Sequence, residues 1–135
     1  HQAMHEVSAE EIRSTAQRLA NVDNRTNGGA VLALEQGDWG ESIVGVARLM
    51  RPEGDVASPE AEAAIVIRDD FQGEGVGTEL LRRLVLLARQ MQVRSMVADI
   101  EANNYSALRL FRKLDLPTTA TTSRGETIML IEMPY

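Results

Sequence analysis

A glycine-rich turn between an apolar run and a long amphipathic segment constrains this chain more than any other feature. Gly73, Gly75 and Gly77 alternate within residues 72–78, which read Gln-Gly-Glu-Gly-Val-Gly-Thr. The run before the turn, 61–68, is short and rich in β-branched residues, which is typical of a buried strand. The segment after it, 75–92, repeats apolar side chains at helical spacing. The pattern predicts a strand, a turn and a helix that packs against a sheet.

The elements around this unit extend it into a mixed sheet. A strand predicted over 93–100 completes a βαβ unit, whose parallel strands are joined by a right-handed crossover. The remaining C-terminal elements predicted from the pattern are a helix over 104–114, a polar loop over 118–125 and a strand over 127–133.

The N-terminal half predicts one helix and one hairpin. Residues 8–11 have the Ser-x-x-Glu spacing of a capping box, which predicts a helix over about 9–20. Strands over 30–34 and 42–50 flank a turn at 37–40 and predict an antiparallel hairpin. We therefore expect an α/β (α+β) fold in a single domain: a mixed central sheet with an N-terminal hairpin, a βαβ unit and a C-terminal helix and strand.

Composition argues against several classes of function. The chain has no cysteine and only two histidines, so we expect no metal, disulfide or thiol nucleophile. Its 14 basic and 20 acidic residues leave a net charge of -6, which argues against a nucleic-acid partner. The sequence contains no membrane-spanning apolar run and no recognisable leader, so we expect no membrane association and a cytoplasmic location.

The glycine-rich turn has the chemistry of an anion site. At a helix start several N–H groups lack partners and the dipole is positive, and glycines let a phosphate approach the backbone closely. The alternative is a tight turn that merely needs glycine, but one glycine would usually be enough for that. The segment lacks the Gly-Lys-Ser/Thr end of a Walker loop and the spacing of the dinucleotide fingerprint, which disfavours nucleotide hydrolysis and hydride transfer.

Two motifs together resemble the GNAT acyltransferase superfamily. Residues 72–77 are similar to its acyl-CoA pyrophosphate loop, and residues 104–116 to its Asn-x-x-Ala-x-x-x-Tyr/Phe-x-Lys-x-Gly-Phe segment. The resemblance covers 61–116 and is greatest to bacterial protein-lysine acetyltransferase domains. It implies a GNAT-like fold and direct transfer of an acetyl group from acetyl-CoA to a primary amine, on a protein lysine or a small molecule. A catalytically weak acyl-CoA-binding or regulatory module is the alternative.

The chain departs from the family pattern in three places. Phe111 stands where a tyrosine often serves as the general acid, and Asp115-Leu116 replaces the usual Gly-Phe. Residues 1–4 fit a helix or loop, so we expect the first strand of the family fold to be missing. The chain is also expected to form a homodimer or part of a longer protein.

The resemblance assigns the acyl-CoA site to the end of the first strand, the glycine-rich turn and the second helix. Its expected residues are Ile65, Val66, Ile67, Gln72, Gly73, Glu74, Gly75, Val76, Gly77, Thr78, Asn104, Ala107 and Phe111. The candidates for the 3′-phosphate are Arg82, Arg83, Arg109, Arg112 and Lys113, and the sequence does not choose among them.

Acyl transfer to an amine also needs a base, because an alkylammonium group has a pKa of about 10.4. Glu60 and Glu62 lie on one face at the head of the strand, where either could also be simply solvated. Glu62 is preferred, because it is nearer the apolar core and matches the base of similar lysine acetyltransferases. A backbone N–H near Ile67 is expected to stabilise the oxyanion. A thiolate can leave without help from a general acid, so Phe111 is compatible with catalysis. Tyr105 is not expected to replace the missing tyrosine, because it lies on another side of the helix.

Overall fold

The computed structural model describes residues 3–7, 17–23, 28–73 and 75–134. The strands are β1 (Ala3–Val7), β2 (Gln17–Asp23), β3 (Gly28–Gly37), β4 (Gly40–Met50), β5 (Glu60–Ile67), β6 (Ser95–Glu101), β7 (Thr118–Ser123) and β8 (Glu126–Glu132). The helices are α1 (Val76–Gln90) and α2 (Tyr105–Arg112), and a 3-10 turn spans Asp69–Phe71.

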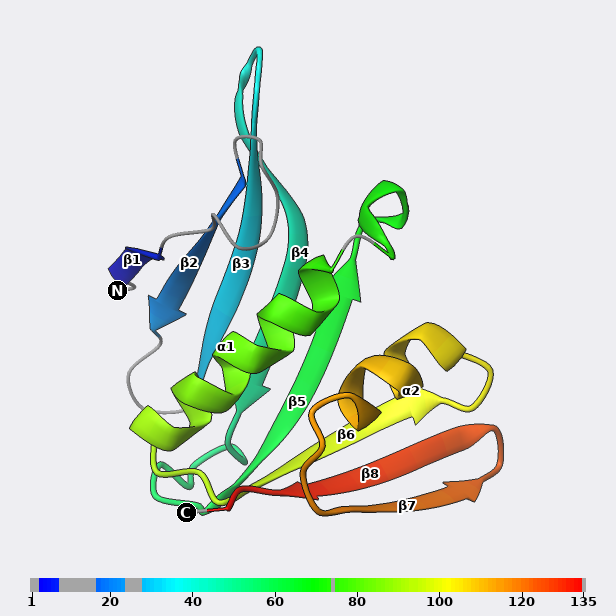
Figure 1. The fold of residues 1–135 in the computed structure, drawn as a ribbon. Helices are drawn as coiled ribbons and strands as arrows, with labels where there is room; N and C mark the ends of the chain where they lie inside the picture. Colours follow the sequence, from blue (N-terminus) through cyan, green and yellow to red (C-terminus); the bar gives the residue numbers. More distant parts are fainter. Residues whose placement is uncertain (1–2, 8–16, 24–27, 74, 135) are drawn as a thin grey trace.

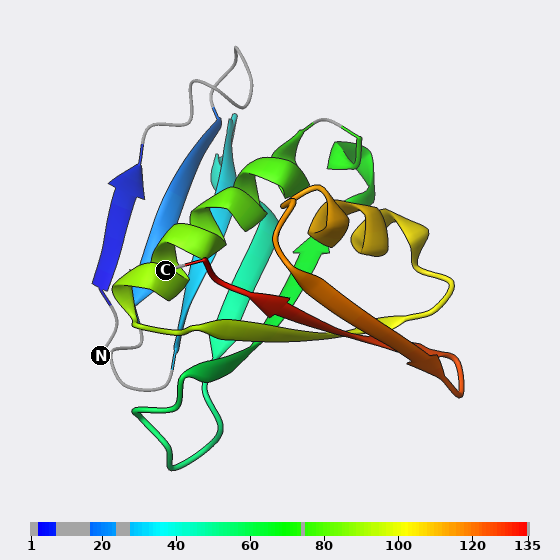
Figure 2. The ribbon, with the colours of Figure 1, turned by 60° about the horizontal axis from the view of Figure 1, so that its bottom comes forward.

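These strands form one mixed sheet in the order β1-β2-β3-β4-β5-β6-β8-β7. The β3–β4 hairpin is antiparallel and β5 pairs with β6 in parallel, across the α1 crossover. The sheet is strongly twisted, so β6, β8 and β7 run at a large angle to β3, β4 and β5 (Figures 1 and 2). The expected mixed α+β fold, with its hairpin, βαβ unit and C-terminal helix and strand, is confirmed.

Three local predictions are wrong, each where the sheet overrides a local pattern. Residues 17–20 belong to strand β2 and not to a helix, because they pair with β3; residues 9–16 of the predicted helix lie outside the described part. Ala3–Val7 form strand β1, where a helix or loop was expected. The expected loop at 118–125 contains β7, whose threonines are β-branched and suit an exposed strand.

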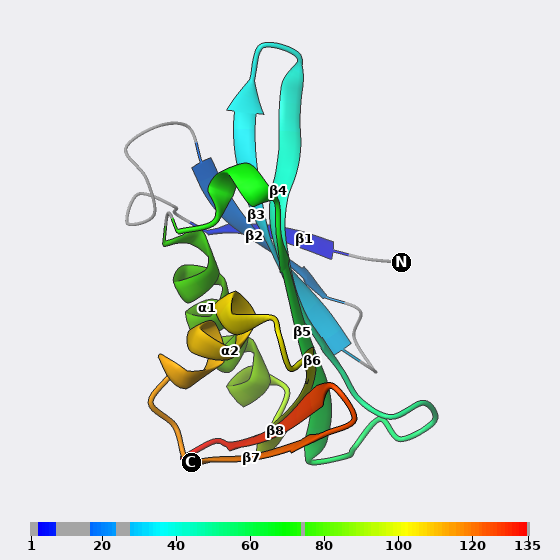
Figure 3. The ribbon, with the colours of Figure 1, turned by 90° about the vertical axis from the view of Figure 1, so that its right-hand side faces the viewer.

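Helix α1 supplies most of the contact with the sheet. Leu80, Leu81 and Leu84 are fully buried against it, as the helical spacing of apolar residues predicts. Helix α2 lies beside α1 on the same side of the sheet, so one face of β5 is covered by helices (Figure 3). Along β5 the buried residues alternate with exposed ones, and the exposed set points to the opposite face.

The polar segment 51–59 forms the expected loop, but its first residue is buried. The Arg51 guanidinium donates a hydrogen bond to the carbonyl oxygen of Ser58 at 2.9 Å and another to that of Met91. The side chain therefore ties the β4–β5 loop to the C-terminal end of α1. A buried arginine with such partners serves structure, which a polar sequence pattern does not reveal.

Candidate functional site

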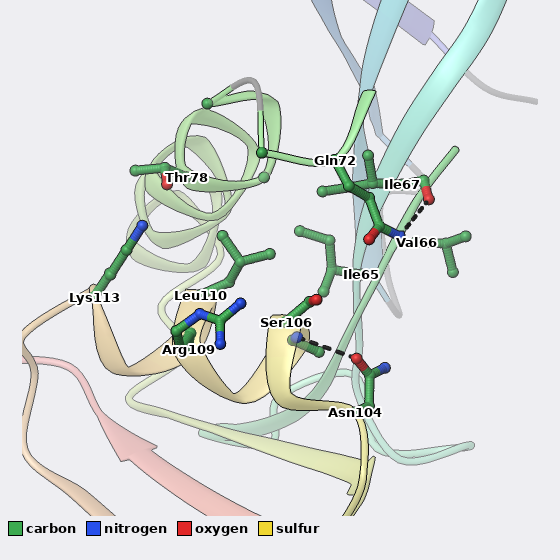
Figure 4. A pocket seen from close by; sticks show the side chains of 14 residues that line it. Ile65, Val66, Ile67, Gln72, Thr78, Asn104, Ser106, Arg109, Leu110 and Lys113 are labelled. Carbon is green, nitrogen blue, oxygen red and sulfur yellow. Dashed lines mark hydrogen bonds between the residues drawn. The ribbon is translucent and has the colours of Figure 1, made fainter. Parts of the chain in front are cut away.

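Strands β5 and β6 separate soon after they begin to pair. Their parallel register covers only residues 60–62 of β5 and 95–97 of β6, after which β6 continues beside β8. A cavity of about 340 Å³ lies between the rest of β5, the glycine-rich turn and α2 (Figure 4). It is lined by Ile65, Val66, Ile67, Gln72, Gly73, Gly75, Gly77, Thr78, Asn104, Ser106, Ala107, Arg109, Leu110 and Lys113.

The unpaired edge of β5 presents backbone groups to this cavity. The N–H of Arg68 donates to the carbonyl of Val44 on β4 at 2.8 Å, so alternate residues before Arg68 also direct their polar backbone groups toward β4. The residues between them, including Ile65 and Ile67, direct their N–H and C=O groups away from β4. A bound amide chain can therefore hydrogen-bond to this edge as a further strand would.

The turn after β5 depends on two glycines with left-handed backbone. Gly73 has φ of +76° and Gly75 of +87°, and a Cβ at either position would meet nothing within 4 Å. Glycine is thus required at these positions because the backbone is left-handed, and not because neighbouring atoms leave no room for a Cβ. The Gln72 carboxamide donates to the carbonyl of Ile67 at 3.5 Å and to Asp69 Oδ1 at 3.4 Å, which holds its side chain over the turn. Glu74, which was predicted to contact the cofactor, lies outside the described residues.

Helix α1 begins at this turn, and its first N–H groups lie before the ladder of helical hydrogen bonds. Its first helical hydrogen bond runs from the N–H of Glu79 to the carbonyl of Gly75 at 3.1 Å, so the N–H groups of Val76, Gly77 and Thr78 precede the helical ladder. The Val76 side chain is fully buried, which leaves only its backbone for a ligand. These donors and the helix dipole fit a pyrophosphate group, as the sequence pattern predicts.

An ion pair stabilises the start of the turn. Arg68 donates to both carboxylate oxygens of Asp70, at 2.7 and 2.9 Å, and lies 3.7 Å from Glu35. Its guanidinium stacks over the Phe71 ring at 5.1 Å from the centroid. The hydrogen bond from Arg68 holds the pKa of the Asp70 carboxyl below its usual value.

One face of α2 forms the other wall of the cavity. Asn104 begins the helix, and its side-chain oxygen accepts a hydrogen bond from the N–H of Ala107 at 3.2 Å. The residues that follow it into the cavity are Ser106, Arg109, Leu110 and Lys113. Their spacing of three, four and seven residues is that of one helix face, so the sequence held a signal that could have found Ser106 and Leu110.

The same geometry separates the five basic candidates. Arg109 and Lys113 line the cavity, and Arg112 does not. Arg82 and Arg83 form ion pairs with Glu79 on α1.

Phe111 was predicted to form a wall of the acyl-CoA site, but it does not line this cavity. Its ring is 1% exposed and belongs to the core. It borders a second hollow, between β5 and β6, together with Asn104 and Ala107. This second hollow lies where the strands diverge, and Phe111 is one of the residues that line it.

The two candidate bases lie apart from the cavity. Glu60 and Glu62 are exposed on the face of β5 that α1 does not cover, and they border a separate hollow with Met50 and Val97. Glu62 pairs with Val97 at the last position before β5 and β6 separate. Of the two glutamates, Glu62 is therefore nearer the point where the two strands part.

The described part of the chain contains no group of three acidic or histidine side chains placed to hold a metal ion. Among the same residues, no helix has the length and apolar character needed to cross a bilayer.

Known proteins with similar sequences are acyltransferases. An L-methionine sulfoximine/L-methionine sulfone acetyltransferase of Pseudomonas aeruginosa is 40% identical over 53 residues, 39% of this chain and 31% of that protein. The L-amino acid N-acyltransferase MnaT of Escherichia coli is 39% identical over 59 residues, 44% of this chain and 34% of that protein. The alignments thus span about a third of the length of these curated relatives.

Solved structures share the fold at lower sequence identity. The GNAT domain of S. lividans PAT has a TM-score of 0.69 at 19% identity, with 94% of this chain and 70% of that chain covered. The cAMP-binding acyltransferase from Mycobacterium smegmatis has a TM-score of 0.72 at 17% identity, with 99% and 48% covered. The sequence profile of the Acetyltransferase (GNAT) family matches residues 2–116. A match over most of the chain, on a fold of this kind, means that the chain belongs to the acetyltransferase (GNAT) family.

Proposed function

We propose that this chain acts as one domain that transfers an acetyl group from acetyl-CoA directly to a primary amine. One observation carries the proposal: a single cavity runs from the unpaired edge of β5 to the N-terminus of α1. The edge of β5 suits the amide-containing arm of a CoA thioester, and the N-terminus of α1 suits its pyrophosphate. These two parts of the thioester need different hydrogen-bond donors. When bound, acetyl-CoA supplies an acetyl group activated as a thioester.

The proposed binding residues follow from this order. Gln72 and the backbone from Gly73 to Thr78, with Glu74 included from the sequence, serve the pyrophosphate. The backbone of Ile65 and Ile67 and the side chains of Asn104 and Ala107 serve the pantetheine arm. Val66 borders the cavity through its backbone, because its side chain points to the opposite face of the sheet. Phe111 contributes by holding α2 against the sheet, since its ring is buried in the core.

Glu62 is the proposed base. Its carboxylate lies on the opposite face of the sheet from α1, beside the point where β5 and β6 part. An amine that enters from that face can give up its proton to Glu62, directly or through a water, and then meet the acetyl group at the hollow between β5 and β6. The acetyl group lies at the end of the arm away from the pyrophosphate, so the N–H of Ile65, which is directed away from β4 and lies nearer Glu62 than that of Ile67, is the proposed donor to the developing oxyanion.

The proposed acceptor is the amine of a small amino acid. The printed names of two relatives, L-methionine sulfone acetyltransferase and L-amino acid N-acyltransferase, support this class. Arg48 on β4 is exposed in register with Ala64 on β5, two positions along from the pair Met50 and Glu62 and therefore on the same face. Diagonal neighbours on one sheet face lie about 7–8 Å apart, a separation that suits a carboxylate held by Arg48 and an amine at Glu62.

The test is thiol release from acetyl-CoA with a panel of amines, alongside a titration with CoA. A neutral L-amino acid and its amide should be compared in the wild type and in Arg48→Met. We expect Arg48→Met to raise KM about tenfold or more for the amino acid and to leave the amide unchanged, because only the amino acid offers a carboxylate. CoA binding without turnover on any amine or lysine peptide would favour the acyl-CoA-binding module instead.

A further inference from the structure

The hollow between β5 and β6 has a volume of about 490 Å³ and lies beyond the position proposed for the acetyl group. We propose that it receives longer acyl chains, so that this chain also transfers uncharged alkyl acyl groups such as propionyl and butyryl. This inference rests on the proposed function, since it assumes that a CoA thioester occupies the cavity.

The reaction with a longer acyl group has the same balance as acetyl transfer. Glu62 takes a proton from the ammonium group of the acceptor, and the neutral nitrogen forms a bond to the acyl carbon. The carbon–sulfur bond breaks, and its electron pair goes to the sulfur. A second proton passes from the nitrogen to the departing thiolate through water.

The hollow adjoins the cavity at the end proposed for the acyl group. Ile65, Asn104 and Ala107 line both spaces. Figure 4 shows Asn104 at the end of the cavity away from Thr78, near which the pyrophosphate is proposed to bind. Because the N–H of Ile65 is the proposed oxyanion donor, the acyl carbonyl lies at this junction. An acetyl group adds only a methyl group beyond its carbonyl carbon, so the hollow is open to a longer chain.

The apolar side chains around the hollow leave room for an alkyl chain. Ala63 on β5 and Ala107 on α2 are 3% and 9% exposed, and neither side chain extends beyond its Cβ. Ile100 and Phe111 are also buried and complete the apolar part of the lining. Because residue 111 is a phenylalanine and not a tyrosine, its ring carries no hydroxyl group that needs a partner. An alkyl chain placed there is removed from water at no polar cost.

Carboxylates border the other part of the hollow. Asp99 and Glu101 line it and are exposed, and they alternate along β6 with the buried Ile100. They therefore lie on the face of the sheet that the helices do not cover. Among the residues that the structure describes, no lysine or arginine lines this hollow. An acyl group that ends in a carboxylate, such as succinyl, would be repelled there, which restricts the class to uncharged chains.

The acceptor amine and the acyl chain do not compete for the same space. Glu62 lines the separate hollow that contains Met50 and Val97, and it does not line the hollow between β5 and β6. The amine can therefore approach from the side of Glu62 while the acyl chain extends toward Phe111.

The experiment is isothermal titration with acetyl-CoA, propionyl-CoA, butyryl-CoA and succinyl-CoA without an amine, followed by initial rates with one neutral L-amino acid. The test variant is Ala63→Val, which fills part of the hollow from β5. The matched control is Ala47→Val. Ala47 is a buried alanine on β4, in register with Ile65, and lines neither the cavity nor the two hollows. Both substitutions add the same methyl groups to a buried position, so both carry an overpacking cost.

We expect the wild type to bind butyryl-CoA about tenfold more tightly than acetyl-CoA, since each methylene group moved from water to an apolar site contributes about fourfold. Propionyl-CoA should lie between the two, and succinyl-CoA should bind more weakly than butyryl-CoA. All three uncharged donors should yield the corresponding amide. Ala63→Val should lose the preference for butyryl-CoA and keep its affinity for acetyl-CoA, whereas Ala47→Val should keep the preference.

Three results would overturn the inference. Butyryl-CoA that binds the wild type no more tightly than acetyl-CoA, or that binds without forming the amide, would show that the hollow does not serve a longer acyl chain. A preference that survives in Ala63→Val as it does in Ala47→Val would place the alkyl chain outside the hollow. Succinyl-CoA bound as tightly as butyryl-CoA would refute the restriction to uncharged chains. A wild type that binds no CoA thioester would instead refute the proposed function, and the inference with it.

Discussion

Leu110 Cδ1 lies only 2.6 Å from the position that a Cβ on Gly77 would occupy, and Ile67 Cδ1 lies at the same distance from it. Gly77 is the point where β5, the first turn of α1 and α2 come together. Because these three elements form the cavity walls, the missing side chain sets how closely they approach. The glycine is required there by close packing, whereas Gly73 and Gly75 are required by their backbone conformation.

Gly77→Ala should therefore weaken CoA binding about tenfold or more. The added methyl group forces the ends of Ile67 and Leu110 to shift, with an overpacking cost of about 1–3 kcal/mol that the better helix propensity of alanine partly offsets. Titration with CoA and thermal unfolding measure the two effects. Gly37→Ala is the control, because its Cβ would make only an ordinary contact of 3.5 Å, in the β3–β4 hairpin. Unchanged CoA affinity in Gly77→Ala would contradict this account of the cavity walls.

Gly75→Glu should abolish CoA binding in a protein that still folds. The carboxylate would lie at the turn proposed for the pyrophosphate and repel it, and the left-handed backbone adds strain. Gly54→Glu matches the strain, since Gly54 has φ of +80° and open space around it, but it lies in the β4–β5 loop. We expect Gly54→Glu to be destabilised similarly and to bind CoA normally. If both variants bind CoA equally well, the pyrophosphate assignment fails.

Glu62→Gln should lower the rate at pH 7 by about 100-fold or more while CoA affinity stays the same, because a base acts on the amine. Glu60→Gln is the matched control, two residues away on the same strand face. Steady-state kinetics and a CoA titration on both variants measure the difference. A rate loss confined to Glu60→Gln would transfer the role of base to Glu60.

Asp115→Gly should stabilise the fold by up to about 1 kcal/mol. Asp115 has φ of +55°, in the left-handed region that costs other residues more than glycine. This residue follows α2, where the family pattern has glycine. Chemical denaturation of Asp115→Gly and Asp115→Val measures the effect, and the valine variant should be less stable than the wild type. Equal stability of the two variants would show that the turn tolerates any side chain.

The substitution Asp70→Asn should destabilise the protein near neutral pH, and this effect should disappear in acid. The Asp70 pKa is lowered in the folded state by its hydrogen bond from Arg68, so the carboxylate contributes stability above its unfolded pKa of about 3.9. That contribution disappears as the pH falls through the lower folded value. Unfolding free energies of wild type and Asp70→Asn should thus converge below about pH 4. A constant difference across that range would show that the carboxylate charge adds nothing.

Periodicity and glycine spacing in the sequence by themselves determined the β3–β4 hairpin, strand β5, helix α1 and the crossover to β6. They also led to the prediction of an anion site at the turn from Gly73 to Gly77, because a helix start with nearby glycines offers backbone N–H groups to an anion. These features are local, and the residues that create them are close in the chain. The identification of Asn104 as the start of α2 is of the same kind.

Only the tertiary structure decided which side chains face one another. Residues 17–23 are a strand because β3 lies beside them, and Thr118–Ser123 because β8 does. Lys113 lines the cavity and Arg82 and Arg83 do not, because α2 packs against Gly77. No local sequence pattern shows that contact. Phe111 belongs to the core and not to the cavity for the same reason. Pairing and packing join residues distant in the chain, so their outcome depends on the whole sheet.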